Sequence, residues 1–460
     1  SSHAYNGSGG NWDYTMVSTM HGTFATCHRL GRNSSFKMNG CNLVNLTSEH
    51  NSGENMRYTF LQAFGYDIAN EWTQTVRDNT TIELKYWNIA VTASDTTSGV
   101  YLHNMFNECT YFDGDVTGWT ITDPYETHYM FNDCECFTGT GLSTWTVTSP
   151  KQLSWQMNHM FYGCWQLGNE TPIDMSSHAY NGSGGNWDYT MVSTMHGTFA
   201  TCHRLGRNSS FKMNGCNLVN LTSEHNSGEN MRYTFLQAFG YDIANEWTQT
   251  VRDNTTIELK YWNIAVTASD TTSGVYLHNM FGHCTYFDGD LTGWTITDPY
   301  ETHYMFTDCE CFTGTGLSTW TIGSRERPGV LHNLKTSWGN APNGIDHTIS
   351  ISGGPILGGS AGFSNFVNWL GDGSATAKEN IHSGSMIGYG SSVAHWGADV
   401  TGGNSWVGFE LNQSKTITSY RIWPLAGKRV GSEVGGTHFR EQSAPRDWTI
   451  QGSNDNSSWT

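Results

Sequence analysis

One short pattern constrains the fold of this chain more than any other feature. A phenylalanine is followed three residues later by cysteine and three residues after that by Phe or Leu, as in Phe106, Cys109 and Phe112. We call the first residue the slot phenylalanine. The pattern returns at Phe131 and Phe161, and looser copies begin at Phe24 and Phe60. A recurring period of roughly 25 residues, as between Phe106 and Phe131, is typical of solenoid proteins.

The spacing also predicts local structure. Phe106, Cys109 and Phe112 are three residues apart, which places them on one face of a helical turn. Trp119 and Ile121 alternate with threonines, the pattern of a short strand with one buried face. One turn and one strand cannot bury their apolar faces alone, but stacked coils can. We therefore predict a mainly β chain with short helical turns, arranged as a solenoid.

The predicted core consists of the slot residues of the clearest coils. Their cysteines suit tight packing, because Cys behaves as a small apolar residue. Ala63 in the same place favours a steric role. For the cysteines outside the slot, disulfides remain an alternative, and Cys134 with Cys136 is the closest approach to a metal pair; no metal site is predicted. The predicted core residues are Phe106, Cys109, Phe112, Phe131, Cys134, Phe281, Cys284, Phe306 and Cys309.

A larger repeat encloses the small one. Residues 1–147 recur as 176–322, an offset of 175, with five differences: Asn107/Gly282, Glu108/His283, Val116/Leu291, Asn132/Thr307 and Val147/Ile322. The domains expected are repeat unit one (1–147), a connecting coil (148–175), repeat unit two (176–322), an unassigned linker or β region (323–374) and an end domain (375–460). Because Ser1 corresponds to Ser176, inside the array, the sequence is expected to be a segment of a longer protein.

The repeat units resemble the BspA-type leucine-rich repeats of bacterial, protist and viral surface proteins. The resemblance covers residues 1–322 and is carried by Met-Phe-x-x-Cys-x-x-Phe followed by Trp-x-(Ile/Val). The best matches are Met105–Ile121, Met130–Val147 and their copies Met280–Ile296 and Met305–Ile322. The intervals from Phe24 to Phe60 and from Phe60 to Phe106 are longer and need insertions or a hidden coil near Trp87. The resemblance implies a right-handed solenoid with a surface or adhesive role and no catalysis.

The last part of the chain has a different character. Short alternating runs with Gly, Asn and Ser turns predict a β-sandwich. The runs Trp406–Leu411, Lys415–Ile422 and Pro445–Thr460 resemble the discoidin, or factor 5/8 C-type, galactose-binding-like jelly rolls. The resemblance covers about 375–460 and lacks the closing strand, so the domain is expected to be incomplete. Its loops combine aromatic and polar groups suited to a sugar: Tyr389, His395, Trp396, Arg429, His438 and Arg440.

The composition limits the classes of partner that this chain is expected to bind. The chain has 460 residues and a formal net charge of −18 with only 23 Lys and Arg, so nucleic acid is not an expected partner. No run approaches the roughly 18 apolar residues of a membrane span. Asp113-Gly114-Asp115 is a fragment of a calcium loop, but the remaining acids are missing, which favours turn residues. His103, His128 and His159 precede Met-Phe pairs and are expected to form a surface ladder, with pH sensing as the alternative.

These observations favour a non-enzymatic extracellular protein of a cell or virion surface. The repeats would act as spacer and contact surface of an adhesin or a fibre or decoration protein, with a glycan-binding-like end module. Expected partners are a cell-surface or capsular glycan, or neighbouring copies in a homo-oligomeric assembly, with no cofactor and no catalytic residues. The alternative is a segment of a secreted carbohydrate-active enzyme whose catalytic domain lies elsewhere.

Overall fold

The computed structural model describes residues 12–47, 54–95, 98–148, 154–177, 186–222, 229–267, 274–301 and 305–323, together with short strands at 350–352, 354–355, 368–371 and 406–409. Within these ranges the chain is mainly β, with a few short helices, as the sequence predicts. Nearly all the described structure precedes Ser324, and we refer to residues 12–323 as the repeat stack.

The first half of the repeat stack contains ten strands, one α-helix and two short 3-10 helices among its described residues. They are β1 (Ser35–Lys37), β2 (Asn42–Leu46), η2 (Ala69–Glu71), α1 (Gln74–Asp78), β3 (Thr81–Glu83), β4 (Asn88–Val91), β5 (Val100–Tyr101), β6 (Thr120–Thr122), β7 (Pro124–Glu126), η3 (Leu142–Thr144), β8 (Thr146–Thr148), β9 (Trp155–Gln156) and β10 (Ile173–Asp174).

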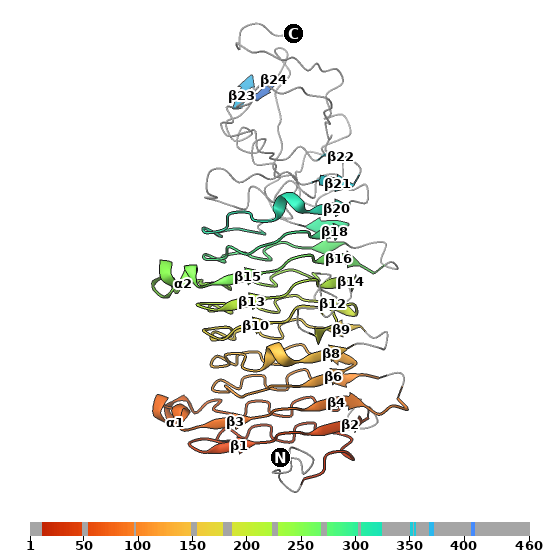
Figure 1. The fold of residues 1–460 in the computed structure, drawn as a ribbon, viewed down its shortest axis with the longest axis vertical. Helices are drawn as coiled ribbons and strands as arrows, with labels where there is room; N and C mark the ends of the chain where they lie inside the picture. The colour runs from red at the N-terminus through yellow and green to blue at the C-terminus, as the bar shows by residue number, and fades with distance from the viewer. Residues whose placement is uncertain are drawn as a thin grey trace, which may run out of the picture. The chain divides into compact units, whose positions relative to one another are not determined.

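In the second half, the order from β1 to β8 returns as β13 to β20, preceded by two further strands. Its elements are β11 (Asn186–Trp187), β12 (Val192–Thr194), β13 (Ser210–Lys212), β14 (Asn217–Leu221), η5 (Ala244–Glu246), α2 (Gln249–Asp253), β15 (Thr256–Glu258), β16 (Asn263–Val266), β17 (Val275–Tyr276), β18 (Thr295–Thr297), β19 (Pro299–Glu301), η6 (Leu317–Thr319) and β20 (Thr321–Gly323). The helices α1 and α2 project from the same side of the repeat stack (Figure 1).

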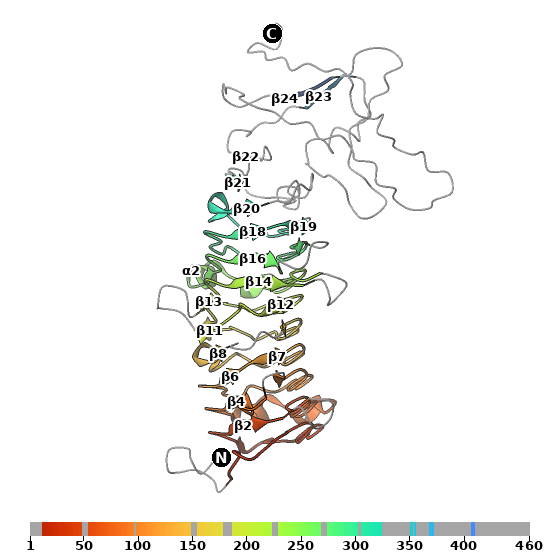
Figure 2. The same ribbon diagram turned by 90° about the vertical axis from the view of Figure 1, so that its right-hand side faces the viewer.

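Strands of successive coils pair in parallel, and the pairs beside the tryptophans show no register shift. The principal sheet of the first half has the order β11-β8-β6-β4-β2, and that of the second half begins β14-β16-β18-β20. Thr120 pairs with Thr146 and Ile121 with Val147, as Thr295 pairs with Thr321. A second edge of the repeat stack carries the sheet β12-β9-β7-β5 (Figure 2). The predicted parallel strands beside Trp119, Trp145, Trp294 and Trp320 are therefore confirmed.

The long interval between Phe60 and Phe106 is one coil with an insertion. Strand β2 pairs directly with β4, and β4 pairs directly with β6. The residues between Phe60 and β4 include η2 and α1, which extend the coil sideways, and β3, which pairs in parallel with β1 of the preceding coil. The Thr73 hydroxyl caps α1 by accepting a hydrogen bond from the Val76 backbone N–H. Within the described range 54–95, no additional coil lies around Trp87, whose strand belongs to the same coil as Phe60.

The slot phenylalanines form one column through the interior. Adjacent rings lie face to face, with centroids 5.0–5.4 Å apart and interplanar angles of 3–10°. All except Phe24, at the N-terminal end of the repeat stack, are fully buried. The column runs unbroken from one repeat unit to the next through Phe161 of the connecting coil. Its members are Phe24, Phe60, Phe106, Phe131, Phe161, Phe199, Phe235, Phe281 and Phe306.

The backbone around the slot is not the helical turn that the spacing suggested. Asn104 and Glu108 adopt left-handed conformations, with φ of 55° and 59°. The Phe106 and Glu108 amides consequently point to the next coil, where they donate to the carbonyls of Met130 and Asn132 (2.7 and 2.8 Å). The Cys109 amide donates within its own coil to the Phe106 carbonyl. Spacing of three residues is shared by helices and by such consecutive turns, so the sequence pattern alone does not separate them.

The slot cysteines make a regular set of hydrogen bonds. The Cys109 thiol donates to the Phe60 carbonyl of the preceding coil, with sulfur and oxygen 2.9 Å apart, and Cys134 donates to Phe106 in the same way at 3.1 Å. The steric interpretation of this position is therefore incomplete, since each thiol also bonds to the previous coil. Equivalent bonds join Cys164 to Phe131, Cys202 to Phe161, Cys284 to Phe235 and Cys309 to Phe281.

Beyond Gly323, described structure is sparse. Strand β21 (Ser350–Ser352) pairs in parallel with β20, so the sheet continues past the point where the repeat pattern ends. It pairs antiparallel with β22 (Gly354–Pro355). Separately, β23 (Asn368–Gly371) and β24 (Trp406–Phe409) form an antiparallel pair. Apart from β24, the end domain predicted over 375–460 lies outside the described residues.

Replacing Phe106 with alanine should lower the free energy of unfolding by roughly 3–5 kcal/mol, because it leaves a cavity between two stacked rings. Chemical denaturation followed by tryptophan fluorescence measures this. Phe24→Ala is the matched control, since Phe24 fills the same position but is only half-buried. Equal losses in the two variants would contradict the interior column.

Cys109→Ala should lower stability by about 1 kcal/mol, because a weak hydrogen bond and one small buried atom are lost. In the native protein, alkylation should reach the exposed thiol of Cys27 and reach Cys109 only after unfolding. Non-reducing peptide mass spectrometry that found Cys109 joined to Cys134 would refute the assignment of both as buried thiols.

Candidate functional site

Polar side chains follow the strands of the sheet β12-β9-β7-β5 at one edge of the repeat stack. His103 comes two residues after β5, His128 two residues after β7, and His196 two residues after β12. The rings of His103 and His128 stack, with centroids 4.6 Å apart and an interplanar angle of 14°. His159 stacks instead on Tyr129, at 4.9 Å and 1°. The expected ladder therefore joins His103 to His128, while His159, one residue closer to its slot phenylalanine, stacks on the tyrosine.

A carboxylate accompanies the two stacked imidazoles. Glu126 ends β7, and its Oε2 lies 3.0 Å from Nδ1 of His103. His103 is 3% exposed, whereas Glu126 and His128 are half-buried. On the other side of the ring, Nε2 of His103 is 3.9 Å from Oε1 of Glu54, which also pairs with Arg57. Sequence reasoning identified the two histidines but missed Glu126, because its place beside His103 depends on how two coils align.

The charges around this cluster lower the pKa of the Glu126 carboxyl. Burial on its own raises the pKa of the Glu126 carboxyl, but hydrogen bonding to His103 and the charges of His103, His128 and Arg57 outweigh it. The net pKa of Glu126 is lower than its ordinary value, so this group is a carboxylate at neutral pH. The cluster thus brings two imidazole rings and one negative carboxylate together, with one possible ligand atom of each within 4.8 Å of the others.

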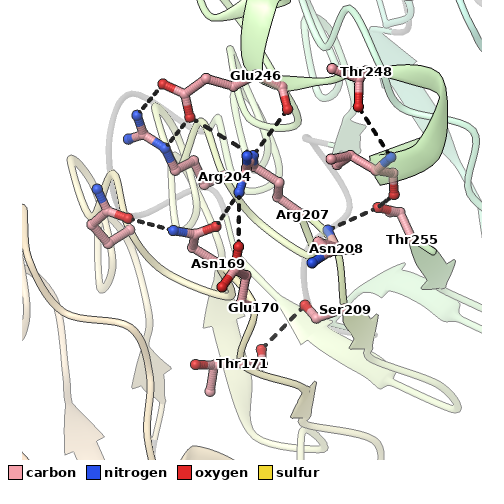
Figure 3. Close-up of polar contacts among 12 residues, drawn as sticks. Asn169, Glu170, Thr171, Arg204, Arg207, Asn208, Ser209, Glu246, Thr248 and Thr255 are labelled. Atoms are coloured by element: carbon pink, nitrogen blue, oxygen red, sulfur yellow. Dashed lines mark hydrogen bonds and ion pairs between the residues drawn. The ribbon is translucent and has the colours of Figure 1, made fainter. Parts of the chain in front are cut away.

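Figure 3 shows a second polar cluster, built where the connecting coil meets repeat unit two. The Arg204 guanidinium donates to both carboxylate oxygens of Glu246, and Arg207 Nε donates to the Glu246 carbonyl (3.2 Å). Arg207 Nη1 also donates to Oδ1 of Asn169 (2.8 Å) and pairs with Glu170 at 3.5 Å. Three successive coils are joined by these contacts.

The first repeat unit holds the same arginine pair in a different environment. Arg29 pairs with Glu71, as Arg204 does with Glu246. The Arg29 side chain is 63% exposed, whereas that of Arg204 is 17% exposed. The sequences are identical here, so the difference comes from the connecting coil that lies beside repeat unit two. This cluster therefore joins coils, and its arginines are occupied by protein partners.

The Asp-Gly-Asp stretch has a structural role. Asp113 Oδ1 accepts hydrogen bonds from the backbone and hydroxyl of Thr138 in the next coil (3.0 and 2.8 Å). Asp115 Oδ1 accepts from the Thr117 backbone, and its other oxygen is 3.0 Å from the Lys85 ammonium. A Cβ on Gly114 would meet the Phe112 ring at 2.5 Å, so only glycine fits. The two carboxylates serve different coil contacts, in agreement with the turn interpretation.

Burial raises the pKa of eight of the eleven thiols in the chain. All eleven are free thiols in the structure, including the four outside the slot: Cys41, Cys136, Cys216 and Cys311. Arg77 donates to the Cys136 sulfur at 3.2 Å. Burial nevertheless raises the pKa of the Cys136 thiol by more than the arginine lowers it. A thiol that stays protonated at neutral pH is a weak nucleophile and a poor metal ligand.

The predicted glycan-binding residues Tyr389, His395, Trp396, Arg429, His438 and Arg440 lie outside the described residues. The predicted core residues lie inside the repeat stack: all nine are buried, with Cys309 the most accessible at 7%. Two aromatic side chains of the connecting coil are exposed, Trp165 and Tyr162. The Trp165 ring stacks against His203 of the following coil at 5.8 Å.

Comparison with known proteins gives a family match within the repeat region of this chain. Residues 54–174 and 229–329 match the family model described as "Mycoplasma protein of unknown function, DUF285". The two matches begin at Glu54 and Glu229, the same position of each repeat unit. They support a BspA-type repeat region. Neither a curated protein nor a solved structure matches the sequence.

Within the part of the chain that the structure describes, none of the helices is long and apolar enough to cross a bilayer.

His159 should make the protein less stable in mild acid. Burial first, then the charges of His196 and His128, lower the pKa of His159 to about 4. In the unfolded chain a histidine has a pKa of roughly 6.5, so between these values only the unfolded state binds the proton. Stability therefore rises with pH through this window and falls as pH drops from about 6.5 to 4.

His159→Asn should flatten that dependence by on the order of 2 kcal/mol. Asparagine suits the site because Asn104, at the equivalent position, has the same φ of 55°. The measurement is the free energy of unfolding in urea at both ends of the window, with a chelator present. His28→Asn controls for the loss of a histidine elsewhere. An unchanged slope in His159→Asn would contradict the pKa assignment.

Proposed function

We propose that this chain is a non-enzymatic surface protein whose repeat stack is a BspA-type, leucine-rich-repeat-like solenoid. The solenoid acts as a spacer and contact surface, and the region after residue 375 acts as a discoidin-like module that binds a glycan. The setting is extracellular, on a cell or virion surface, as an adhesin or a fibre or decoration protein. The family match to the repeat region is compatible with this setting.

The observation that carries the proposal is the direction of the side chains in each coil. Most apolar side chains of the described coils are buried, with the phenylalanines and tryptophans stacked in columns, and backbone hydrogen bonds run from each coil to the next. A coil built this way contacts only its neighbours, so adding coils adds length without altering the core. Coils stacked about 5 Å apart give a rod whose length is set by the number of repeats.

The arrangement of reactive groups also supports a non-enzymatic role. The slot thiols are buried and bonded to carbonyls, and the partly exposed thiol of Cys136 is held protonated because burial raises its pKa. The carboxylates of Asp113 and Asp115 are occupied in coil contacts. These groups therefore contribute to stacking, and the exposed residues between them remain available for contact with a partner.

The spacer role can be tested with one deletion. Because the two repeat units are nearly identical, removing residues 102–276 joins Tyr101 to Leu277 and leaves the local sequence unchanged. The shortened chain should fold and be shorter in solution, with glycan binding retained. Loss of binding in a folded, shortened chain would show that the second set of coils carries the contact itself.

The end module is tested on a glycan array with the complete chain. We expect binding to at least one glycan class, and at least a tenfold loss in Trp396→Ala combined with Arg440→Ala, because a sugar is held by an aromatic face and fixed polar groups. Trp165→Ala, which removes an exposed aromatic of the repeat stack, is the matched control. Binding to no glycan would refute the module's role, and release of sugar from a polysaccharide would refute the non-enzymatic assignment.

A further inference from the structure

Three side chains from two adjacent coils converge at one point of the repeat stack. They are His103, after β5, Glu126, at the end of β7, and His128, two residues later. One possible ligand atom from each lies within 4.8 Å of the other two. Strands β5 and β7 pair in parallel, with Tyr101 opposite Glu126, so the backbone itself holds the two coils at this separation.

We propose that His103, Glu126 and His128 bind a divalent transition-metal ion of the zinc class, which links the two coils. Two imidazole nitrogens with one carboxylate oxygen form a ligand set that zinc uses in proteins, with a water in the fourth position. Calcium and magnesium are disfavoured, because they take oxygen ligands almost exclusively. The proposal does not depend on the function proposed above.

A carboxylate lies near each ring nitrogen of His103. A metal-binding histidine usually directs its second ring nitrogen at a carboxylate or carbonyl, which orients the ring. Here Glu126 lies at Nδ1 of His103, and the Glu54 carboxylate of the preceding coil lies 3.9 Å from Nε2. Arg57 pairs with Glu54 and balances its charge. The nearly buried His103 closes the inner side, while half-buried Glu126 and His128 leave an access route for the ion.

Binding requires a small rearrangement. Ligand atoms around a tetrahedral zinc ion lie roughly 3.4 Å apart, so a group spread over 4.8 Å must contract. The parallel rings of His103 and His128 cannot both direct a nitrogen at one ion, so the His128 ring must rotate out of the stack. His128 is the more exposed of the two, and rotation about its side-chain torsions leaves the backbone pairing intact.

Within repeat unit one, this set of three ligands occurs at one pair of adjacent coils. In the next coil Gln156 pairs with Glu126 and Asn158 follows β9, so an amide replaces each ligand there. In the preceding coil, Arg57 stands three residues before its slot phenylalanine, where His103 stands before Phe106. Repeat unit two carries His278, Glu301 and His303 at the corresponding sequence positions, so a titration must allow for a second equivalent.

The test uses the complete chain, freed of metal by a chelator. Zinc chloride is titrated in a calorimeter, and cobalt is added separately because a tetrahedral site with nitrogen ligands gives visible absorption. His128→Ala and Glu126→Gln, which change half-buried residues, should each remove one equivalent of zinc. In the wild type, zinc at a hundredfold above its Kd should raise the Tm by roughly 5 °C, and the variants should show a smaller rise.

His28→Ala, which removes another half-buried histidine of the repeat stack, should retain full stoichiometry. Circular dichroism confirms that each variant is folded before titration. Absence of zinc binding by the wild type would overturn the proposal. So would undiminished stoichiometry in both folded ligand variants, or an equal loss in His28→Ala, which would indicate non-specific binding to surface histidines.

Discussion

The stacking of the coils depends on two distances that are nearly equal. Parallel strands that exchange backbone hydrogen bonds lie about 4.8 Å apart, and stacked aromatic rings are favourable at centroid distances from about 4.5 Å. A flat ring placed at the same point of every coil therefore stacks on the next without distorting the backbone. The slot phenylalanines satisfy this, with centroids 5.0–5.4 Å apart. A second column formed by Trp87, Trp119 and Trp145 obeys the same constraint at 4.9–5.0 Å.

The same constraint explains why long insertions and a large duplication are tolerated. The insertion that carries α1 leaves the ladder at one edge and returns to it, so β2 and β4 still pair in parallel, with one register shift between Leu43 and Leu46. The connecting coil supplies its own slot residue, Phe161, which stacks on both Phe131 and Phe199. The second repeat unit therefore adds to the first with no break in the column.

The sequence predicted those features that depend on one coil alone. The buried slot residues and the strands beside the tryptophans follow from spacing within a coil. Features that depend on the alignment of two coils were missed: the thiol of Cys109 bonds to the Phe60 carbonyl of the preceding coil, and Glu126 reaches back to His103 in the coil before its own. The left-handed turns were also missed. The sequence pattern is defined by the Phe and Cys positions and indicates nothing about the φ angles of Asn104 and Glu108.

The two repeat units show how this architecture separates core from surface. Val116 and its counterpart Leu291 are both buried, so this difference changes packing by one methylene group. The difference between Glu108 and its counterpart His283 changes the charge of the side chain. In repeat unit one, burial and then the Glu108 charge raise the pKa of Asp133 above its ordinary value. In repeat unit two, His283 replaces the glutamate, and its Nδ1 lies 2.7 Å from the carboxylate of Asp308.

An unfavourable pair of acids in one repeat unit is thus a histidine–carboxylate pair in the other. The backbone at this position is unchanged, with φ of 59° at both Glu108 and His283. Since the column of rings fixes the coil from inside, the outer position can change its charge without changing the fold. Successive repeat units can therefore present different surface charges on the same backbone.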